Sequence, residues 1–485
     1  MKRREFTGIT AATAAGLAMG IKTSGAKSPT GKGKGKPNIL FIMTDQQHAS
    51  MMSCTGNKQL RTPALDALAA SGVRFERAYA SNPVCVPSRF SLQTGLMPSA
   101  IGMGRNGDSG KSKVTDAMVA RSIGPILSAA GYETVYGGKV HMPKQFNRLA
   151  NLGYRNLTRD QRGGLAKACA EFIKGPHKKP FFMFASFMNP HDICYMAIND
   201  YNRSKGRAPI GNLDSRICEG LLKKPRTSGD VKAFVDKHCP PLPVNHNVPE
   251  NEPEAITTRY TNVRQFRNYA RDKWTETKWR LHRWTYCRLT EMVDEHIGVV
   301  LKSLKDAGLE DDTIVIFTSD HGDMDSAHKL EHKSILYEEA ARIPFIMSHK
   351  NRIPKGAVND THLISNGLDL ICTLCDYAGV EAPKGLSGAS IRPLAEGKKV
   401  SDWRDSVVVE SQNGRMLRTD RYKYCIYDSG ANREQLIDLK NDPGEMKNLA
   451  GDPAFKTVLE KHRKLLQTWV KQTGDKIGAR YVTVT

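Results

Sequence analysis

The sequence lacks the features that mark several common classes of protein. Beyond its first residues it contains no apolar run long enough to span a bilayer, so we expect no membrane span. Its ten cysteines are scattered along 485 residues, which excludes the dense disulfide framework of small secreted domains. It has no zinc finger, RNA-binding signature or heptad array. Nothing besides charge therefore indicates nucleic acid, and we expect no nucleic-acid partner.

Acidic residues are also in short supply. The 72 Lys and Arg residues outnumber the 50 Asp and Glu residues, which gives a formal net charge of +22. A field of this sign favours anionic partners, such as sulfated or phosphorylated polymers. The alternative interpretation is a solvated basic surface that serves export or solubility. The chain length indicates one large α/β domain with a smaller one, because a single core rarely grows to this size.

The first 26 residues are interpreted as a signal peptide. They combine a basic start, a short apolar run over residues 9–21 and small residues at 24–26. Arg3 and Arg4, followed by Phe6, resemble a twin-arginine signal for the export of folded proteins, with an ordinary Sec signal as the alternative. Residues 27–36 (KSPTGKGKGK) indicate a flexible basic linker. We therefore expect a bacterial protein that is exported to the periplasm or secreted.

Buried strands alternate with helices through most of the chain. Such alternation predicts an α/β fold, with a mostly parallel sheet between two layers of helices, over residues 37–400. Several of these strands end in polar residues, and ligands of parallel sheets collect at the carboxyl ends of the strands. The segments that carry the pattern are 37–47, 62–72, 122–142, 180–192 and 288–323.

Two parts of the chain depart from this alternation. Residues 200–280 are rich in Arg, Lys, Pro and Asn, and predict an insertion of loops and short helices near the site that sets substrate selectivity. Residues 401–485 predict a smaller α+β domain, with antiparallel strands at 406–411 and 414–428 and an amphipathic helix at 452–474.

Four residues at strand ends suggest a metal site. Asp45, Gln46, Asp320 and His321 offer oxygen and nitrogen ligands, and the two carboxylates would repel each other without a cation or proton between them. The oxygen ligands suit Ca²⁺, while His321 leaves Mn²⁺ open. Read alone, the segment SDHG could equally be a solvated turn.

The segment CVPSRFSLQTG (85–95) resembles the signature of the type I sulfatases, Cys-x-Pro-Ser-Arg followed by Thr-Gly. Further segments match in family order as far as residue 450: PNILFIMTDQQ, GYETVYGGKVH, PFFMFASFMNPH, FTSDHGDM, HKSILYEEAARIPFI and LIDLKNDPGEMKNL. The resemblance implies the alkaline-phosphatase-like fold.

The resemblance also implies that Cys85 is not used as a thiol. In this family a maturating enzyme, the formylglycine-generating or sulfatase-maturating type, oxidises the signature cysteine to formylglycine. The hydrated aldehyde beside a divalent cation then supplies the nucleophile, and its second hydroxyl expels sulfate. Cys85 thus joins Asp45, Gln46, Asp320 and His321 in the implied metal site. Pro87 and Ser88 belong to the signature that the maturating enzyme recognises.

The remaining roles are carried over by the same resemblance. Arg89 would hold the modified residue and the metal, and Lys139 would add positive charge to the sulfate pocket. His141 would be the base that deprotonates the hemiacetal. His191 and Lys333 would grip the sulfate, and His191 is the preferred acid because the pKa of an imidazole lies near working pH. For His328 and His332, substrate binding and a structural role are both open.

Two departures from the family pattern keep the substrate and the metal open. Gln46 stands where many members have Asp, and His321 where many have Asn, and both forms also resemble choline sulfatases and phosphonate monoester hydrolases. We expect an exported sulfatase acting on sulfated carbohydrate. The alternatives are a phosphonate monoester or phosphodiester hydrolase with the same nucleophile, and a non-catalytic polyanion-binding protein with unmodified Cys85.

Overall fold

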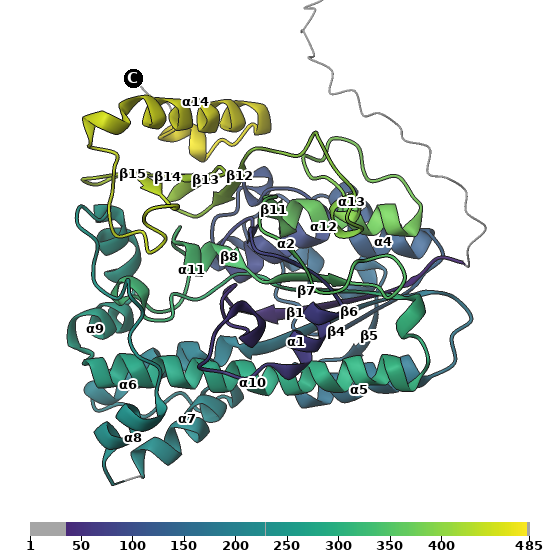
Figure 1. Ribbon diagram of the computed structural model, residues 1–485, viewed down its shortest axis with the longest axis horizontal. Helices are drawn as coiled ribbons and strands as arrows, with labels where there is room; N and C mark the ends of the chain where they lie inside the picture. The colour runs from purple at the N-terminus through teal and green to yellow at the C-terminus, as the bar shows by residue number, and fades with distance from the viewer. Residues whose placement is uncertain (1–34, 228, 483–485) are drawn as a thin grey trace, which may run out of the picture. The chain divides into compact units, whose positions relative to one another are not determined.

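The computed structural model describes residues 35–227 and 229–482 (Figure 1). The expected signal peptide (1–26) and most of the expected linker (27–36) lie outside these residues. The central sheet has eight strands, of which β7, β1, β6, β4 and β5 are mutually parallel. In spatial order the strands are β10 (Ala357–Asn359), β2 (Gly72–Phe75), β9 (Phe345–Ser348), β7 (Thr313–Ser319), β1 (Asn38–Asp45), β6 (Phe181–Pro190), β4 (Glu133–Gly138) and β5 (Arg155–Thr158).

Helices cover both faces of this sheet, as the sequence predicts (Figure 1). Strand β1 is apolar at successive positions because alternate side chains point to opposite faces and both faces are buried. Phe41 joins one core cluster and Ile42 joins the other. The first face packs on α2 (Cys85–Thr94), α4 (Ile123–Ala129) and α12 (Asn366–Ala378). The second packs on α1 (Pro63–Ala70), α5 (Gly163–Lys174) and the long α10 (Glu276–Asp306).

The C-terminal part contains the antiparallel sheet and helix that the sequence predicts. Its strands are β12 (Val407–Glu410), β13 (Gly414–Arg418), β14 (Tyr422–Tyr427) and β15 (Glu434–Asp438), followed by α14 (Lys456–Thr473). One face of this sheet packs on Leu459 and Leu466 of α14. The other face packs on Leu336 and Tyr337, so the described residues from Lys36 onward form one compact unit. The predicted boundary near residue 400 falls between α13 (Arg392–Ala395) and β12.

The segment 200–280 contains more regular structure than the predicted loops and short helices. It contains α7 (Leu213–Arg226), α8 (Val231–His238), the π-helix η7 (Ile256–Thr261) and α9 (Gln265–Lys273), and it follows α6 (Cys194–Ser204). Cys218 and Phe234 from these helices pack on Trp279 and Trp284 of α10 and make a core of their own. Among the described residues, no helix combines the length and apolar character needed to cross a membrane.

Candidate active site

The site is built where adjacent parallel strands end. Asp45 is the last residue of β1, and Asp320 follows β7 directly. Lys139 follows β4, and His191 follows β6. Because β7, β1, β6 and β4 are neighbours in this order, their carboxyl ends bring together four residues from distant parts of the chain.

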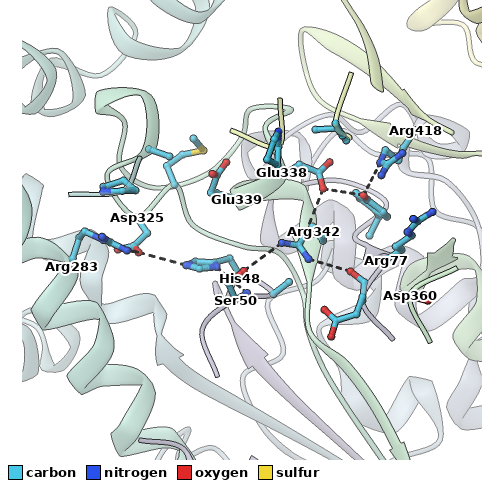
Figure 2. A pocket seen from close by; sticks show the side chains of 18 residues that line it. His48, Ser50, Arg77, Arg283, Asp325, Glu338, Glu339, Arg342, Asp360 and Arg418 are labelled. Atoms are coloured by element: carbon cyan, nitrogen blue, oxygen red, sulfur yellow. Dashed lines mark hydrogen bonds and ion pairs between the residues drawn. The ribbon is translucent and has the colours of Figure 1, made fainter. Parts of the chain in front are cut away.

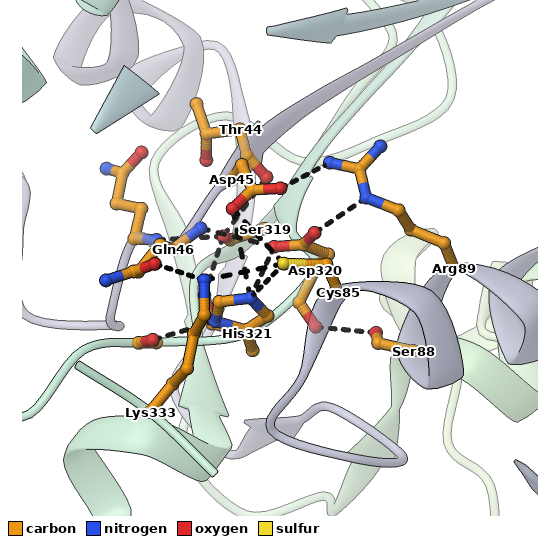
Figure 3. Close-up of polar contacts among 12 residues, drawn as sticks. Thr44, Asp45, Gln46, Cys85, Ser88, Arg89, Ser319, Asp320, His321 and Lys333 are labelled. Atoms are coloured by element: carbon orange, nitrogen blue, oxygen red, sulfur yellow. Dashed lines mark hydrogen bonds and ion pairs between the residues drawn. The ribbon is translucent and has the colours of Figure 1, made fainter. Parts of the chain in front are cut away.

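Helix α2 supplies Cys85 from the opposite side (Figure 3). The sequence CVPSRFSLQTG favours a short helix with proline in its first turn and Gly95 at its end, where φ is +71°. Cys85 is the first residue of the helix and is fully buried. Its Sγ lies 3.1 Å from His321 Nε2, 3.4 Å from Lys333 Nζ and 3.7 Å from Asp45 Oδ1. The cysteine therefore lies at the point where the polar residues converge.

Arg89 lies one turn after Cys85, on the same face of α2. Its guanidinium donates from Nε to Asp320 Oδ2 at 2.7 Å and from Nη2 to Asp45 Oδ2 at 2.9 Å. A third nitrogen donates to Ser186 Oγ at 2.8 Å. The planar fork of arginine thus bridges two buried carboxylates that would otherwise repel each other.

Two lysines complete the positive charge around these carboxylates. Lys139 Nζ lies 2.7 Å from Asp45 Oδ2, and Lys333 Nζ contacts both Gln46 Oε1 and Cys85 Sγ. Lys139 is positioned by Gly138, whose φ is +91° and where a Cβ would lie 2.0 Å from the carbonyl oxygen of Ser186. Three buried or nearly buried cations therefore lie around these two carboxylates.

The pKa values of Asp45 and Asp320 are shifted in opposite directions. Burial raises the pKa of Asp45, but the surrounding cations outweigh burial and hold this pKa well below its ordinary value; the permanent cations are Lys139, Arg89 and Lys333. Burial and the neighbouring Asp45 raise the pKa of Asp320 to about 6, against the opposing effects of His321 and Arg89. A buried pair of this kind is stabilised by a divalent cation placed between its members.

The donor atoms fit such a cation. One atom each from Asp45, Cys85, Asp320 and His321 lie within 4.8 Å of one another. His321 Nδ1 lies 2.9 Å from the carbonyl oxygen of Gly322, which only accepts, so Nδ1 carries a proton, and in the neutral ring Nε2 presents its lone pair to the site. Two carboxylates and an imidazole nitrogen are suitable ligands for Ca²⁺ or Mn²⁺.

Gln46 adds an amide oxygen to this group. Its Nε2 donates to Asp323 Oδ2 at 2.6 Å, which orients Oε1 toward Lys333 and toward Cys194 Sγ at 3.1 Å. Its backbone φ is +70° and its N–H donates to Asp320 Oδ1 at 3.2 Å. The glutamine at this position therefore matches a carboxylate partner, Asp323, that would repel an aspartate here.

The other predicted histidines lie in different surroundings. The side chain of His191 is half-buried, its Nδ1 has no hydrogen-bond partner among the described residues, and burial together with Lys139 and Lys333 lowers its pKa well below the ordinary value. His141 is exposed on the loop after β4. The structure does not bring His141 into contact with Cys85 or the carboxylates.

His328 and His332 also lie outside the contacts around Cys85. The His328 ring stacks on Tyr337 at 4.0 Å and its nitrogens lie near Glu339 and Glu445. His332 contacts Glu331, and its ring centroid is 5.2 Å from that of Phe266.

Several contacts of the site involve residues to which sequence reasoning gave no site role. Ser186 binds Arg89, Asp323 and Cys194 bind Gln46, and Ser88 donates to the carbonyl oxygen of Asp320 at 2.6 Å. The sequence could have indicated a role for Ser186, because it is the one hydroxyl residue within the apolar run of β6. It gave no such indication for Cys194, since a cysteine on a helix is most often a small core residue.

A cavity of about 410 Å³ opens beside Lys333, and we call it the arginine cleft. Lys333 and Val84, the neighbour of Cys85, line its inner end. Four arginines are among the other residues of its lining: Arg105, Arg259, Arg264 and Arg267. The lining contains no Asp or Glu, and its five charged side chains are all basic.

A second cavity of about 420 Å³ is lined by neither Cys85 nor the residues around it (Figure 2). Three of its four arginines pair with carboxylates, two of them with carboxylates of the same wall. Arg283 lies 3.1 Å from Asp325, and Arg342 lies 3.5 Å from Glu338. This cavity contains several ion pairs, and Arg418, which has no carboxylate partner within ion-pair distance among the described residues, donates instead to the Tyr79 hydroxyl and the Thr419 carbonyl oxygen.

The chain is similar to known proteins in sequence and in structure. A family model described as Sulfatase matches residues 37–380, and one described as N-sulphoglucosamine sulphohydrolase, C-terminal, matches residues 326–472. The chain is 29% identical to a Delta 4,5-hexuronate-2-O-sulfatase of Bacteroides thetaiotaomicron, over 94% of this chain and 93% of the relative. It is 25% identical to an N-acetylglucosamine-6-O-sulfatase of the same organism, with 91% and 87% covered. The solved structure of a 2-O GAG sulfatase matches with a TM-score of 0.76 at 28% identity, covering 92% of this chain and 94% of that chain.

Proposed function

The chain belongs to the sulfatase family of sulfuric ester hydrolases, with the alkaline-phosphatase-like fold, and from this premise we propose that it removes sulfate from a sulfated carbohydrate at Cys85. The observation that carries the proposal is the position of Cys85. It is fully buried, lies within 3.7 Å of an imidazole, an ammonium group and a carboxylate, and is adjacent to the arginine cleft.

Three lines of evidence support the carbohydrate substrate. Two relatives that match over nearly their whole length are named for sulfated hexuronate and N-acetylglucosamine. The formal net charge of +22 favours polyanions. The cleft volume of about 410 Å³ lies within the range of small-molecule sites.

We propose that Cys85 is converted to formylglycine by a maturating enzyme. The hydrated aldehyde supplies two hydroxyl groups on one carbon, so one can attack sulfur and the other can later release sulfate. A divalent cation, held by Asp45, Asp320, His321 and Gln46, would add positive charge and lower the pKa of a neighbouring hydroxyl. Ca²⁺ suits the oxygen donors, and Mn²⁺ is the alternative.

The other side chains of the site act on charge and protons. Lys139 and Lys333 attract the anionic ester and stabilise charge that builds up on the sulfuryl oxygens. His191 protonates the leaving alcohol. Its pKa is held low by burial and by these lysines, and an anionic ester beside it favours the proton that the acid role requires. Arg89 keeps Asp45 and Asp320 in position. The assignment of the base role to His141 rests on the resemblance alone.

The proposal is tested with the matured protein on 4-nitrophenyl sulfate and on a phosphonate monoester. We expect faster hydrolysis of the sulfate, and a preference for the phosphonate would favour the alternative hydrolase. Cys85→Ser should abolish turnover and keep measurable substrate binding, because a serine lacks the second hydroxyl. Cys54→Ser, at a half-buried cysteine outside the site, is the matched control and should keep activity. Normal turnover by Cys85→Ser would refute the mechanism.

Intact-mass analysis of protein from its native host tests the modification itself. Replacement of the thiol by an aldehyde oxygen lowers the mass, and an unchanged mass would favour the non-catalytic polyanion-binding protein. The proposed export follows from residues 1–26, and cell fractionation tests it. Protein found only in the cytoplasm of the native host would contradict it.

A further inference from the structure

The arginine cleft contains cations that no carboxylate of the protein neutralises. Arg105 and Arg259 have acidic partners, with Asp108 at 3.3 Å and Asp428 at 3.8 Å. Among the described residues, no carboxylate lies within ion-pair distance of Arg264 or Arg267. The Nε of Arg267 is also buried without a hydrogen-bond partner. Two guanidinium groups therefore face the cleft with unused donors.

The protein holds Arg267 in place. The Arg267 guanidinium lies 3.9 Å from the centre of the Tyr260 ring, a cation–π contact that restricts its orientation. Tyr260 is fully buried on the π-helix η7, and its hydroxyl donates to the carbonyl oxygen of Glu331. Ile256, from the same π-helix, packs with Tyr260 in the cluster around Tyr337. The Arg267 guanidinium therefore extends from a rigid wall, and little of its side-chain entropy is lost when it binds a ligand. Arg264 is exposed and precedes α9 directly.

Lys333 links the arginine cleft to Cys85, the residue at which the ester is proposed to react. Lys333 lines the cleft and also places its Nζ 3.4 Å from Cys85 Sγ. A ligand whose sulfate ester reaches Cys85 extends past Lys333 into a channel without acidic groups. In such a channel the potential of several cations is focused on the ligand, because the walls exclude water.

We propose that Arg264 and Arg267 form a subsite for a second anionic group of the substrate, a carboxylate or another sulfate, on the same sugar as the scissile sulfate or on its neighbour. The subsite rests on the proposed function and restricts the class of substrate. The substrate is a sugar with at least two negative charges, one of them distant from the bond that breaks. Guanidinium suits both kinds of anion, because its planar fork binds two oxygens at once.

The experiment compares matched substrates and matched variants. One substrate is a disaccharide with a single sulfate ester. The others are the same disaccharide with an added carboxylate, or with a second sulfate, on the neighbouring sugar. The variants are Arg264→Gln, Arg267→Gln and the double substitution. Arg216→Gln, at an exposed arginine of α7 outside the cleft, is the matched control.

We expect the unaltered protein to prefer the doubly anionic disaccharides. Each cleft variant should lose about tenfold in kcat/KM on these substrates relative to the singly anionic one, equivalent to about 1.4 kcal/mol. The loss should appear in KM, it should shrink as salt is added, and Arg216→Gln should not show it. The disaccharide on which kcat/KM falls more, the one with the added carboxylate or the one with the second sulfate, identifies the second anionic group. An equal kcat/KM ratio in variants and unaltered protein would overturn the subsite.

Binding measurements separate the subsite from the proposed function. Calorimetric titration of Cys85→Ser, with and without Arg264→Gln and Arg267→Gln, measures the preference for two anions without any turnover. If the matured protein hydrolyses no sulfate ester and yet the preference depends on the arginines, the subsite stands and the proposed function fails. If it hydrolyses 4-nitrophenyl sulfate and the titration shows no preference, the function stands and the subsite is wrong.

Discussion

Arg89→Met is the substitution that tests most directly how the site is held together. Methionine keeps much of the length of the side chain and removes its charge. Arg89 is 2% exposed and makes charge-assisted hydrogen bonds of 2.7 and 2.9 Å to Asp320 and Asp45. Such bonds are worth about 1.5–3 kcal/mol each, so a loss of about 3–6 kcal/mol is the first estimate.

Two features of the site limit this loss. Lys139 remains 2.7 Å from Asp45, and Asp320, whose pKa is already raised to about 6, can take up a proton at modest cost. We therefore expect a loss of about 3–5 kcal/mol, typical of a buried ion pair that loses one partner. For about 450 residues the unfolding entropy is about 0.9 kcal/mol per degree, so Tm should fall by about 3–5 °C.

The assay is calorimetric unfolding at pH 7 in the presence of a chelator. Arg155→Met is the control, because Arg155 pairs with Glu133 at 2.7 Å, both side chains are partly exposed, and the substitution should change Tm much less. Added Ca²⁺ should restore part of the loss in Arg89→Met, since a cation between the carboxylates replaces the missing charge. Equal losses in the two variants would show that Arg89 does not hold the carboxylates together.

Three further predictions follow from other contacts. His191→Ala should lower kcat/KM about 100-fold on sulfated sugars and much less on 4-nitrophenyl sulfate, whose leaving group needs no proton; equal losses would assign the acid role elsewhere. Burial lowers the pKa of His282 to about 4, so the folded protein excludes a proton that the unfolded chain binds near pH 6.5, and stability is lost as pH falls between these values. In urea unfolding, His282→Leu should abolish on the order of 2–3 kcal/mol of that loss, and an unchanged pH dependence would contradict this. Gly138→Ala should lower Tm more than Gly131→Ala, since both glycines have φ of +91° but only Gly138 lies against the carbonyl oxygen of Ser186; equal shifts would rule out the steric explanation.

The central strands could be predicted, together with Asp45 and Gln46 at the end of one strand and Asp320 and His321 at the end of another. The pattern that indicates them lies within a short stretch of sequence. A run such as NILFIMTD is apolar at every position that packs on a helix and becomes polar where the strand leaves the sheet. The order of strands then brings Asp45 and Asp320 together. The resemblance to the sulfatases added Cys85 and Arg89, which no local pattern connects with these aspartates.

What could not be predicted depends on contacts between distant residues. The helices between 213 and 273 have few apolar residues of their own, and they are stabilised by packing on Trp279 and Trp284 of α10. The orientation of Gln46 depends on Asp323, which is 277 residues away in the sequence. The separation of His328 from the site depends on its stacking against Tyr337. None of these partners is visible in a local pattern.

The enclosure of Cys85 limits when the proposed oxidation to formylglycine can take place. All ten residues of α2 are buried, so a catalyst needs this segment while it is still extended, before the helix docks. Docking is completed by Asp320, which lies 231 residues after Arg89. At common rates of translation the ribosome takes about 10–50 s to make that stretch. During this interval the segment around Cys85 is still accessible to a catalyst. In a molecule that folds before it is oxidised, the Cys85 thiol is buried and stays unmodified.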